Sequence, residues 1–255
     1  MNYDIFSGFS AEQLKAIRND LDNLRKSLNS RDLRLIDALK GFSMLPPSRL
    51  LDACRTSRQS TFRNPDAAIV EFGVYRGGAL AAMAYGASLN RNFNGVVIGF
   101  DTFEGHTHPP HDSEVDIHGT PQRPVYEEKI RTNEAWASCD MQTVLNNYSE
   151  ISEFLGVNLP QPNLVKGDAQ YTAKSLHRCC PGGISLLRLD MDWYEPTRAA
   201  LTAATPLLCE NGVIIADDYG HHSGVRTAID EWLATLKIRY DCTMTDYSCM
   251  RIILL

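Results

Sequence analysis

The stretch that decides the fold is "AAIVEFGVYRGGALAAMAYGASLNRNFNGVVIGFD", residues 67–101. It begins with an apolar run, passes through a turn that contains glycine, continues through an alanine-rich segment of helical length and ends in a second apolar run. Continuous apolar strands separated by helices are typical of a parallel sheet that helices cover on both faces. We therefore expect a β-α-β unit of an α/β fold here.

The same alternation continues towards the C-terminus. Further apolar runs are "NLVKGD" (163–168), "ISLLRLD" (184–190) and "GVIIADD" (212–218), with helices expected over about 195–208 and 224–236. The closing stretch "KIRYDCTMTDYSCMRIILL" (237–255) holds two β-rich runs with no helix between them, which predicts an antiparallel hairpin at the sheet edge. On such sheets ligands bind outside the carboxyl ends of the strands, near the switch in strand order.

Two segments depart from this alternation. Residues 1–60 predict an N-terminal helical cap before a main domain at 61–255, with an amphipathic helix over 11–29, a second over about 31–42 and a helical stretch at 47–57. The apolar stripe of the first helix suits either packing on the domain or a dimer surface. Residues 104–138 are rich in histidine, proline and acids; a connection of this length predicts a lid over a site, with a surface insertion as the alternative.

Composition narrows the class of protein. The formal net charge is -6 and the chain has no run of Lys or Arg, so we expect neither a nucleic-acid partner nor an anionic membrane surface. The N-terminus lacks the pattern of a signal peptide and no apolar stretch approaches ~18 residues, which favours the cytoplasm. The 7 cysteines form no CxxC pair, so neither a structural zinc site nor a disulfide framework is indicated.

A glycine-containing turn follows the first strand in "VEFGVYRGG" (70–78). Gly73, Gly77 and Gly78 allow positive φ and close approach of a ligand, but their spacing differs from the dinucleotide fingerprint, and a purely structural turn is the alternative. Glu71, at the end of the strand, would repel a pyrophosphate and attract an ammonium or sulfonium group. The charge therefore favours a cationic ligand.

Acids also end the next two strands. Asp101 stands where an acid accepts hydrogen bonds from a ribose diol in nucleotide-binding sheets, and Asp168 suits an adenine amino group. Together with Glu71 they describe a pocket for a nucleoside that carries an amine. S-adenosylmethionine combines ribose, adenine, amine and sulfonium.

Paired acids end the strands at 184–190 and 212–218. Asp190, Asp192, Asp217 and Asp218 should converge, because these strands are expected to be neighbours. Close carboxylates raise each other's pKa unless a cation lies between them. An all-oxygen site suits Mg²⁺, with Ca²⁺ or Mn²⁺ as poorer fits. The alternatives are capping of the following helices, above all for Asp192, and ion pairs with Arg188 or Arg198.

Five stretches together resemble the macrocin O-methyltransferase family: "VEFGVYRGGAL", "GFDTFEG", "LVKGD", "LRLDMDWYEPTRAAL" and "GVIIADDYGHHSGVRTAIDEW", spanning roughly residues 45–237. The resemblance implies a class I methyltransferase fold, with a Rossmann-like, mostly parallel seven-stranded sheet, a C-terminal antiparallel hairpin and flanking helices. It also implies an S-adenosylmethionine- and Mg²⁺-dependent enzyme acting on sugar hydroxyls of natural products, and it favours a homo-oligomer.

The resemblance also assigns site residues. It implies metal ligands at Asp190, Asp217 and Asp218. It implies cofactor contacts at Glu71, Gly73, Tyr75, Gly77, Gly78, Asp101, Thr102, Phe103, Asp168 and Ala169.

The general base is left open by the resemblance. Some relatives carry a histidine three residues after the first acid as a proposed base, where this chain has Trp193. The candidates here are Asp190, Asp192 and His221, with His222 beside it; an exposed loop is the alternative for both histidines. Ala79 also replaces a more usual serine after the glycines, which removes one hydroxyl contact to the cofactor.

The sequence therefore predicts methyl transfer to a hydroxyl of a sugar or glycosylated natural product in secondary metabolism. A metal-dependent enzyme for a catechol-like diol is an alternative, since chelating two adjacent oxygens is the same task. A nicotinamide-dependent oxidoreductase is disfavoured by the glycine spacing. A non-catalytic methyltransferase-like scaffold is the remaining alternative.

Overall fold

The computed structural model describes residues 26, 28–132 and 136–255. The helix expected over 11–29 therefore lies almost wholly outside the described residues. The helical stretches expected at about 31–42 and 47–57 are helices α2 and α3, and α3 runs six residues further than the stretch that predicted it. The α-helices of the described residues are α2 (Ser30–Leu39), α3 (Pro47–Arg63), α4 (Gly78–Ser88), α5 (Gln122–Arg131), α6 (Met141–Leu155), α7 (Ala169–Thr172), α8 (Leu176–Cys179), α9 (Tyr194–Ala204) and α10 (Ser223–Thr235).

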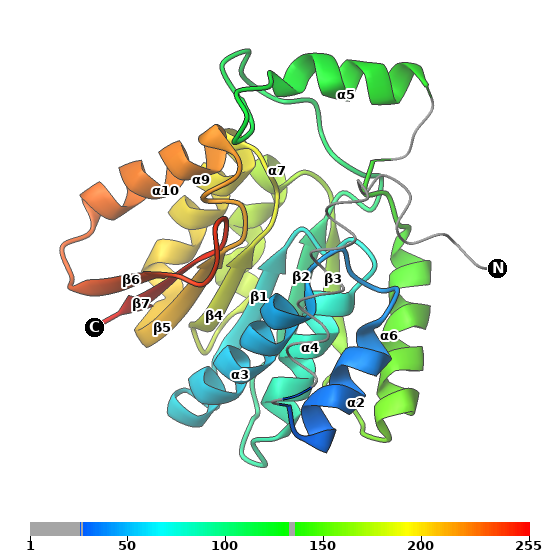
Figure 1. Cartoon of the computed structure of the whole chain (residues 1–255). Helices are drawn as coiled ribbons and strands as arrows, with labels where there is room; N and C mark the ends of the chain where they lie inside the picture. The colour runs from blue at the N-terminus through cyan, green and yellow to red at the C-terminus, as the bar shows by residue number, and fades with distance from the viewer. Residues whose placement is uncertain (1–25, 27, 133–135) are drawn as a thin grey trace.

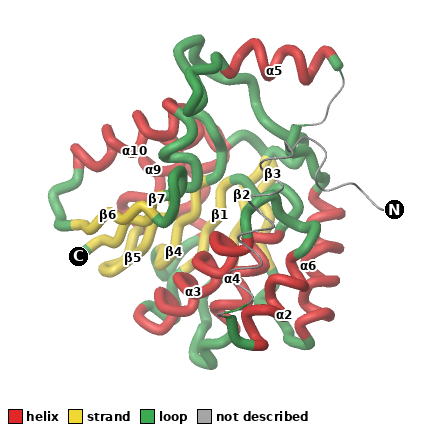
Figure 2. Tube along the Cα trace, viewed as in Figure 1, coloured by secondary structure: helices red, strands yellow, loops and turns green. Residues whose placement is uncertain are grey.

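A seven-stranded sheet forms the centre of the molecule, with strand order β3-β2-β1-β4-β5-β7-β6 (Figures 1 and 2). Strands β1 to β5 pair in parallel, and β7 pairs antiparallel with both β5 and β6. The expected architecture, including the C-terminal hairpin, is confirmed. The strands are β1 (Ala68–Phe72), β2 (Val97–Asp101), β3 (Pro162–Lys166), β4 (Ile184–Leu189), β5 (Leu208–Ala216), β6 (Tyr240–Met244) and β7 (Met250–Leu254).

Helices cover both faces of the sheet because successive side chains of a strand point to opposite faces. On β1, Ile69 belongs to the apolar cluster shared with α2, α3, α4 and α6, whereas Val70 belongs to the cluster shared with α7 to α10. Leu186 and Leu187 divide in the same way on β4. The two clusters are separate cores, one on each face.

Chain direction places the switch in strand order between β1 and β4. From β1 the chain moves outward through β2 and β3, then returns to the other side of β1 at β4. The carboxyl ends of β1 and β4 therefore border the crevice in which open α/β sheets bind ligands. None of the described helices is both long enough and apolar enough to span a bilayer.

Polar residues interrupt the apolar pattern on the face that α3 and α4 cover. Glu71 follows Ile69 on this face of β1, and Arg188 follows Leu186 on this face of β4. The register of the two strands pairs Glu71 directly with Arg188. Glu71 and Arg188 thus form a buried pair near the carboxyl ends of β1 and β4.

Candidate active site at the carboxyl edge of the sheet

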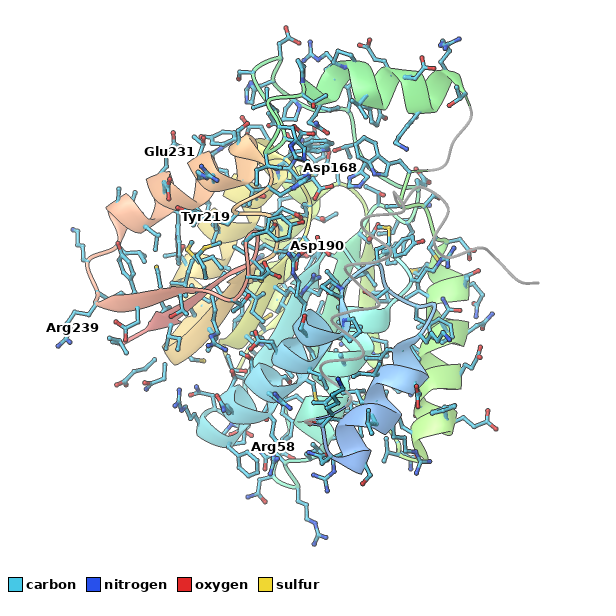
Figure 3. The ribbon with its side chains drawn as sticks, viewed as in Figure 1. Arg58, Asp168, Asp190, Tyr219, Glu231 and Arg239 are labelled. Carbon is cyan, nitrogen blue, oxygen red and sulfur yellow. The ribbon has the colours of Figure 1, made fainter. Side chains whose placement is uncertain are left out.

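Four acids meet where β4 and β5 end. The parallel register pairs Leu189 with Ala216, so the acids that follow each strand lie side by side. Asp190, Asp217 and Asp218 each offer one oxygen atom, and these atoms lie within 4.8 Å of one another. Asp192, Asp218 and His222 form a second group by the same measure. Figure 3 shows Asp190 and Asp168 on this edge of the sheet.

Arg188 forms the floor beneath these acids. Its Nη1 atom lies 2.7 Å from Glu71 Oε1 and 2.9 Å from Asp190 Oδ2, and its Nη2 atom lies 2.9 Å from Asp217 Oδ1. Burial lowers the pKa of the guanidinium, but Asp190, Asp217 and Glu71 outweigh this effect and raise it well above its ordinary value. Arg188 is therefore a fixed positive charge under the cluster.

Arg49 approaches Asp217 from helix α3. Its Nη1 atom lies 3.0 Å from Asp217 Oδ2, and its Nη2 donates to Asp246 Oδ1 at 2.9 Å. Both oxygens of Asp217 are thus paired with arginines. The sequence predicted an ion pair with Arg188 as an alternative to metal binding, but it did not predict the pair with Arg49. Arg198, the other arginine considered, pairs instead with Glu195.

Asp218 and Asp192 are largely buried carboxylates, and no arginine pairs with either of them among the described residues. Burial raises the pKa of Asp218 well above its ordinary value, and the neighbouring Asp192 and Asp217 raise it further. Burial also raises the pKa of Asp192 to about 7, although a hydrogen bond with Asp218 opposes this. Acids this close need a shared proton or a cation between them. The donor set, oxygens with one imidazole at its side, fits a divalent cation.

The backbone at Asp192 turns its side chain into the cluster. Its φ is 64°, and the Trp193 N–H donates to the Met191 carbonyl at 2.8 Å across a three-residue turn. Left-handed backbone of this kind costs roughly 1–3 kcal/mol and is often found at functional sites. The idea that Asp192 caps helix α9 is wrong: Trp193 is the N-cap residue, and the Tyr194 N–H is satisfied by Glu114 Oε1 at 3.0 Å.

Two histidines face Asp192. His106 Nε2 lies 3.2 Å from Asp192 Oδ2, and His222 Nε2 lies 3.8 Å from Asp192 Oδ1. Burial lowers the pKa of each histidine to about 4, so both are neutral at neutral pH. The exposed-loop alternative is wrong for His222, which is buried. His221 is half-buried beside it, with its ring 4.7 Å from that of His222 and 6.5 Å from that of Tyr247.

His106 is a site residue that the sequence did not predict, although it lies in the expected lid. Its partners are Trp193, whose ring centre lies 5.7 Å away, and Asp192, both of which come from the far end of β4. No local spacing links these residues, because the chain between them runs from α5 through α6, β3, α7 and α8 to β4.

The insertion (residues 104–138, described over 104–132 and 136–138) lies over the same edge of the sheet, with α5 at the top of Figure 1. Trp193 Nε1 donates to the Thr107 carbonyl at 3.0 Å, which ties the insertion to the start of α9. Val115 N–H donates to Ser223 Oγ at 2.9 Å and Ser223 N–H to the Val115 carbonyl at 3.0 Å, which ties it to α10. Trp193 and Ser223 therefore attach the insertion to α9 and α10.

The glycines of the turn after β1 are required by packing. Gly73 has φ 87°, and a Cβ atom added to it would lie 1.8 Å from the Asp190 carbonyl oxygen. Gly77, with φ 89°, is the N-cap of α4, and a Cβ on Gly78 would lie 2.5 Å from the Phe42 carbonyl oxygen. The structural reason for these glycines is thus present whether or not a ligand approaches them.

Asp101 organises the turn with its carboxylate. Oδ2 accepts the N–H groups of Val74 at 2.6 Å and Tyr75 at 2.9 Å, and Oδ1 accepts that of Phe103 at 2.8 Å. Tyr75 and Phe103 both have positive φ, which these bonds stabilise. Thr102 donates its hydroxyl to the Gly105 carbonyl at 2.6 Å. Asp101 thereby connects the turn after β1 with the turn after β2.

The remaining rim residues lie on consecutive strands. Asp168 caps α7 by accepting the Gln170 N–H at 2.8 Å, and Ala169 behind it is buried. Glu71 is wholly buried, burial raises its pKa to about 8 against the opposing effect of Arg188, and its Oε2 finds no hydrogen-bond partner among the described residues. Because the order is β3-β2-β1, Asp168, Asp101 and Glu71 follow one another along the edge.

Comparisons with known proteins point to one family and fold. The family model described as macrocin-O-methyltransferase (TylF) matches residues 10–252. Among solved structures, the O-methyltransferase NovP aligns with a TM-score of 0.67 and 24% identity over 82% of this chain and 81% of its own. The calicheamicin methyltransferase CalS11 aligns with a TM-score of 0.64 and 18% identity over 99% and 97%. The comparison with curated protein sequences finds no match.

Proposed function

Because this chain belongs to the macrocin O-methyltransferase family and is an S-adenosylmethionine-dependent O-methyltransferase, we propose that it methylates a hydroxyl of a sugar or glycosylated natural product with the help of Mg²⁺. The observation that carries the proposal is the acidic cluster at the ends of β4 and β5, beside the rim formed by β1, β2 and β3. One site for a cation thus borders one site for a nucleoside.

The rim residues would hold the methyl donor. A bound ammonium or sulfonium group would favour the ionised form of Glu71, whose pKa burial raises to about 8, and the unpartnered Oε2 atom supports this role. Asp101 would face the ribose diol through Oδ1, which accepts fewer backbone N–H groups than Oδ2. Asp168 and Ala169 would border the adenine. The backbone of Gly73 and Gly77 allows close approach.

Asp190 and Asp218 are the strongest metal ligands in this proposal, with Asp217 as the third. Asp217 already pairs with Arg49 and Arg188 through both oxygens, so it contributes mainly by holding the cluster together. Bound Mg²⁺ would supply Lewis acidity, which lowers the pKa of a chelated substrate hydroxyl. The arginines keep the remaining negative charge of the cluster in balance.

Asp192 is the proposed general base. It is held in the cluster by its turn, its pKa is raised to about 7 by burial, and a base poised near the working pH is the most effective. Its carboxylate would accept the hydroxyl proton as the hydroxyl oxygen bonds to the methyl carbon of the donor, whose carbon–sulfur bond breaks to leave S-adenosylhomocysteine. His106, 3.2 Å from Oδ2, orients the carboxylate. His221, the other candidate base, has no role in this step, because the histidine that lies beside Asp192 on this part of the chain is His222.

The insertion would act as the lid that excludes water and selects the acceptor. It is tied to the starts of α9 and α10, the two helices that follow the acidic motifs. The same ties bring His106 to Asp192. Closure over the acceptor and orientation of the base are therefore one structural event in this proposal.

The proposal is tested with labelled S-adenosylmethionine, Mg²⁺ and a panel of glycosylated and phenolic acceptors. Labelled methyl on a sugar hydroxyl, lost in excess EDTA and restored by Mg²⁺, is the expected result. Transfer to catechol-like acceptors alone would favour the alternative substrate class. Full activity in EDTA would remove the metal from the proposal, and failure to bind S-adenosylhomocysteine would leave the scaffold alternative.

A further inference from the structure

The acidic cluster has a second side, which the proposed Mg²⁺ site does not use. Asp192, Asp218 and His222 each offer one ligand atom, and these atoms lie within 4.8 Å of one another. Asp218 belongs to both groups, so the second group extends the cluster from β4 and β5 towards the insertion. The three residues come from the turn after β4, the end of β5 and the N-cap of α10.

His222 provides independent evidence that this side is built for a ligand. Its side chain is only 9% exposed, Nε2 is the nitrogen that faces Asp192, and within the described part of the chain no hydrogen bond to the other nitrogen, Nδ1, fixes the ring. Its Nε2 lies 3.8 Å from Asp192 Oδ1, which is too long for a hydrogen bond. Buried imidazole nitrogens are normally satisfied by a hydrogen bond or a metal.

We propose that Asp192, Asp218 and His222 form a second divalent-cation site on the insertion side of the cluster, with a mixed nitrogen and oxygen donor set. Imidazole is a poor ligand for Mg²⁺ and a good one for Fe²⁺, Ni²⁺ or Zn²⁺, and Mn²⁺ accepts it together with carboxylates. The two sides of the cluster therefore differ in the cations they prefer. The all-oxygen side suits Mg²⁺, and the side with His222 suits a transition metal.

The surroundings supply the outer contacts that such a site needs. His106 Nε2, 3.2 Å from Asp192 Oδ2, would orient this ligand from the insertion, as hydrogen-bonding partners of metal ligands commonly do. Asp116 of the insertion forms a β-bridge with His222 itself. A cation bound here would therefore lie beside the insertion, which contacts the ligands through His106 and Asp116.

The second site has a consequence for catalysis that rests on the proposed function. A cation bound to a carboxylate lowers its affinity for a proton, so a cation at this site would weaken Asp192 as a base. Transition metals in excess should thus inhibit methyl transfer even when Mg²⁺ is saturating. Inhibition should weaken in His222→Gln relative to the uninhibited rate of the same variant.

The direct test uses the metal-free full-length chain with Mn²⁺ in slight molar excess, followed by pulsed electron paramagnetic resonance. We expect echo modulation from a directly bound imidazole nitrogen in the wild type. His222→Gln should abolish that modulation, and His221→Gln, at the adjacent position, should keep it. Absence of nitrogen modulation in the wild type, or its persistence in His222→Gln, would overturn the proposal.

A second variant guards against misfolding of His222→Gln, whose fold is checked by circular dichroism. Asp192→Asn should weaken the nitrogen-coupled Mn²⁺ site at least about tenfold, because it removes a charged ligand. Unchanged affinity in that variant would also count against the site. Neither measurement needs donor or acceptor, so failure of the second site and failure of the methyltransferase proposal are distinguishable.

Discussion

Arg188 Nη1 lies 2.7 Å from Glu71 Oε1, and the two residues stand directly opposite each other in β4 and β1. Both side chains are fully buried, and the same guanidinium also contacts Asp190 and Asp217. This contact joins the strand that begins the nucleoside rim to the strand that begins the acidic cluster. Removal of one partner would leave buried charge uncompensated.

Arg188→Met should lower the free energy of unfolding by about 3–5 kcal/mol, because Glu71, Asp190 and Asp217 would lose their buried cation. Chemical denaturation measures the change. The matched control is Arg198→Met, which breaks an exposed pair with Glu195 and should cost about 1 kcal/mol or less. Equal effects of the two substitutions would contradict the buried network.

Asp192→Asn should lower kcat by about 10²–10⁴, the usual contribution of a general base. It should also raise the melting temperature, because it removes one of several crowded buried charges and asparagine tolerates the left-handed backbone at this position. Kinetics and calorimetry on the same samples check both effects. Asp230→Asn is the control. Asp230 lies on helix α10 and accepts a hydrogen bond from the Tyr219 hydroxyl, and its substitution should change neither kcat nor the melting temperature appreciably.

Trp193→Phe should weaken the attachment of the insertion, since it keeps most of the ring but removes the N–H bond to the Thr107 carbonyl. Loss of about 1 kcal/mol corresponds to about a fivefold rise in the KM of the acceptor, with the KM of the donor unchanged. Trp232→Phe is the control. It removes an equivalent hydrogen bond, from Nε1–H of Trp232 on α10 to Thr205 Oγ1 at 2.8 Å, which does not involve the insertion. Hydrogen exchange should quicken over residues 104–116 in the first variant and not in the second.

Gly73→Ala should destabilise the protein more than Gly119→Ala, although both glycines have positive φ. At Gly73 the new Cβ would meet the Asp190 carbonyl oxygen at 1.8 Å, whereas at Gly119 no described atom lies within 4 Å. The second substitution therefore isolates backbone strain, roughly 1 kcal/mol. The difference between the two changes in free energy of unfolding gives the cost of the contact between the new Cβ and Asp190. Equal changes would show that backbone strain alone destabilises both variants.

Asp246 should contribute a component of stability that depends on pH. Burial opposes ionisation, but hydrogen bonds from Arg49 and from the N–H groups of Cys249 and Ser248 hold the pKa of Asp246 below its ordinary value. A carboxyl with a lowered folded-state pKa stabilises the fold above its ordinary pKa of about 4, and this contribution is lost as pH falls through the folded-state value. The stability difference between wild type and Asp246→Asn should therefore shrink in acid, and a difference constant with pH would contradict the assignment.

Much of the site could be read from the chain because strand ends are visible in the sequence. Each of the apolar runs that end at Asp101, Asp168, Asp190 and Asp217 predicts a strand. Parallel strands bring their carboxyl ends to one edge of the sheet, so these acids were expected there. Side-chain partners were less predictable. The Arg49–Asp217 contact joins residues 168 positions apart and depends on how α3 packs on the sheet.

The sequence by itself determined the α/β class, the acids at the strand ends and the terminal hairpin, because these follow from periodicity and from the length of connections. Only the tertiary structure decided which acids pair with arginines, that Asp192 lies near His106 and His222, and that Trp193 bonds to the insertion. The physical reason is that charge balance and burial depend on packing between elements distant in the chain, whereas hydrophobic periodicity is a property of each element alone.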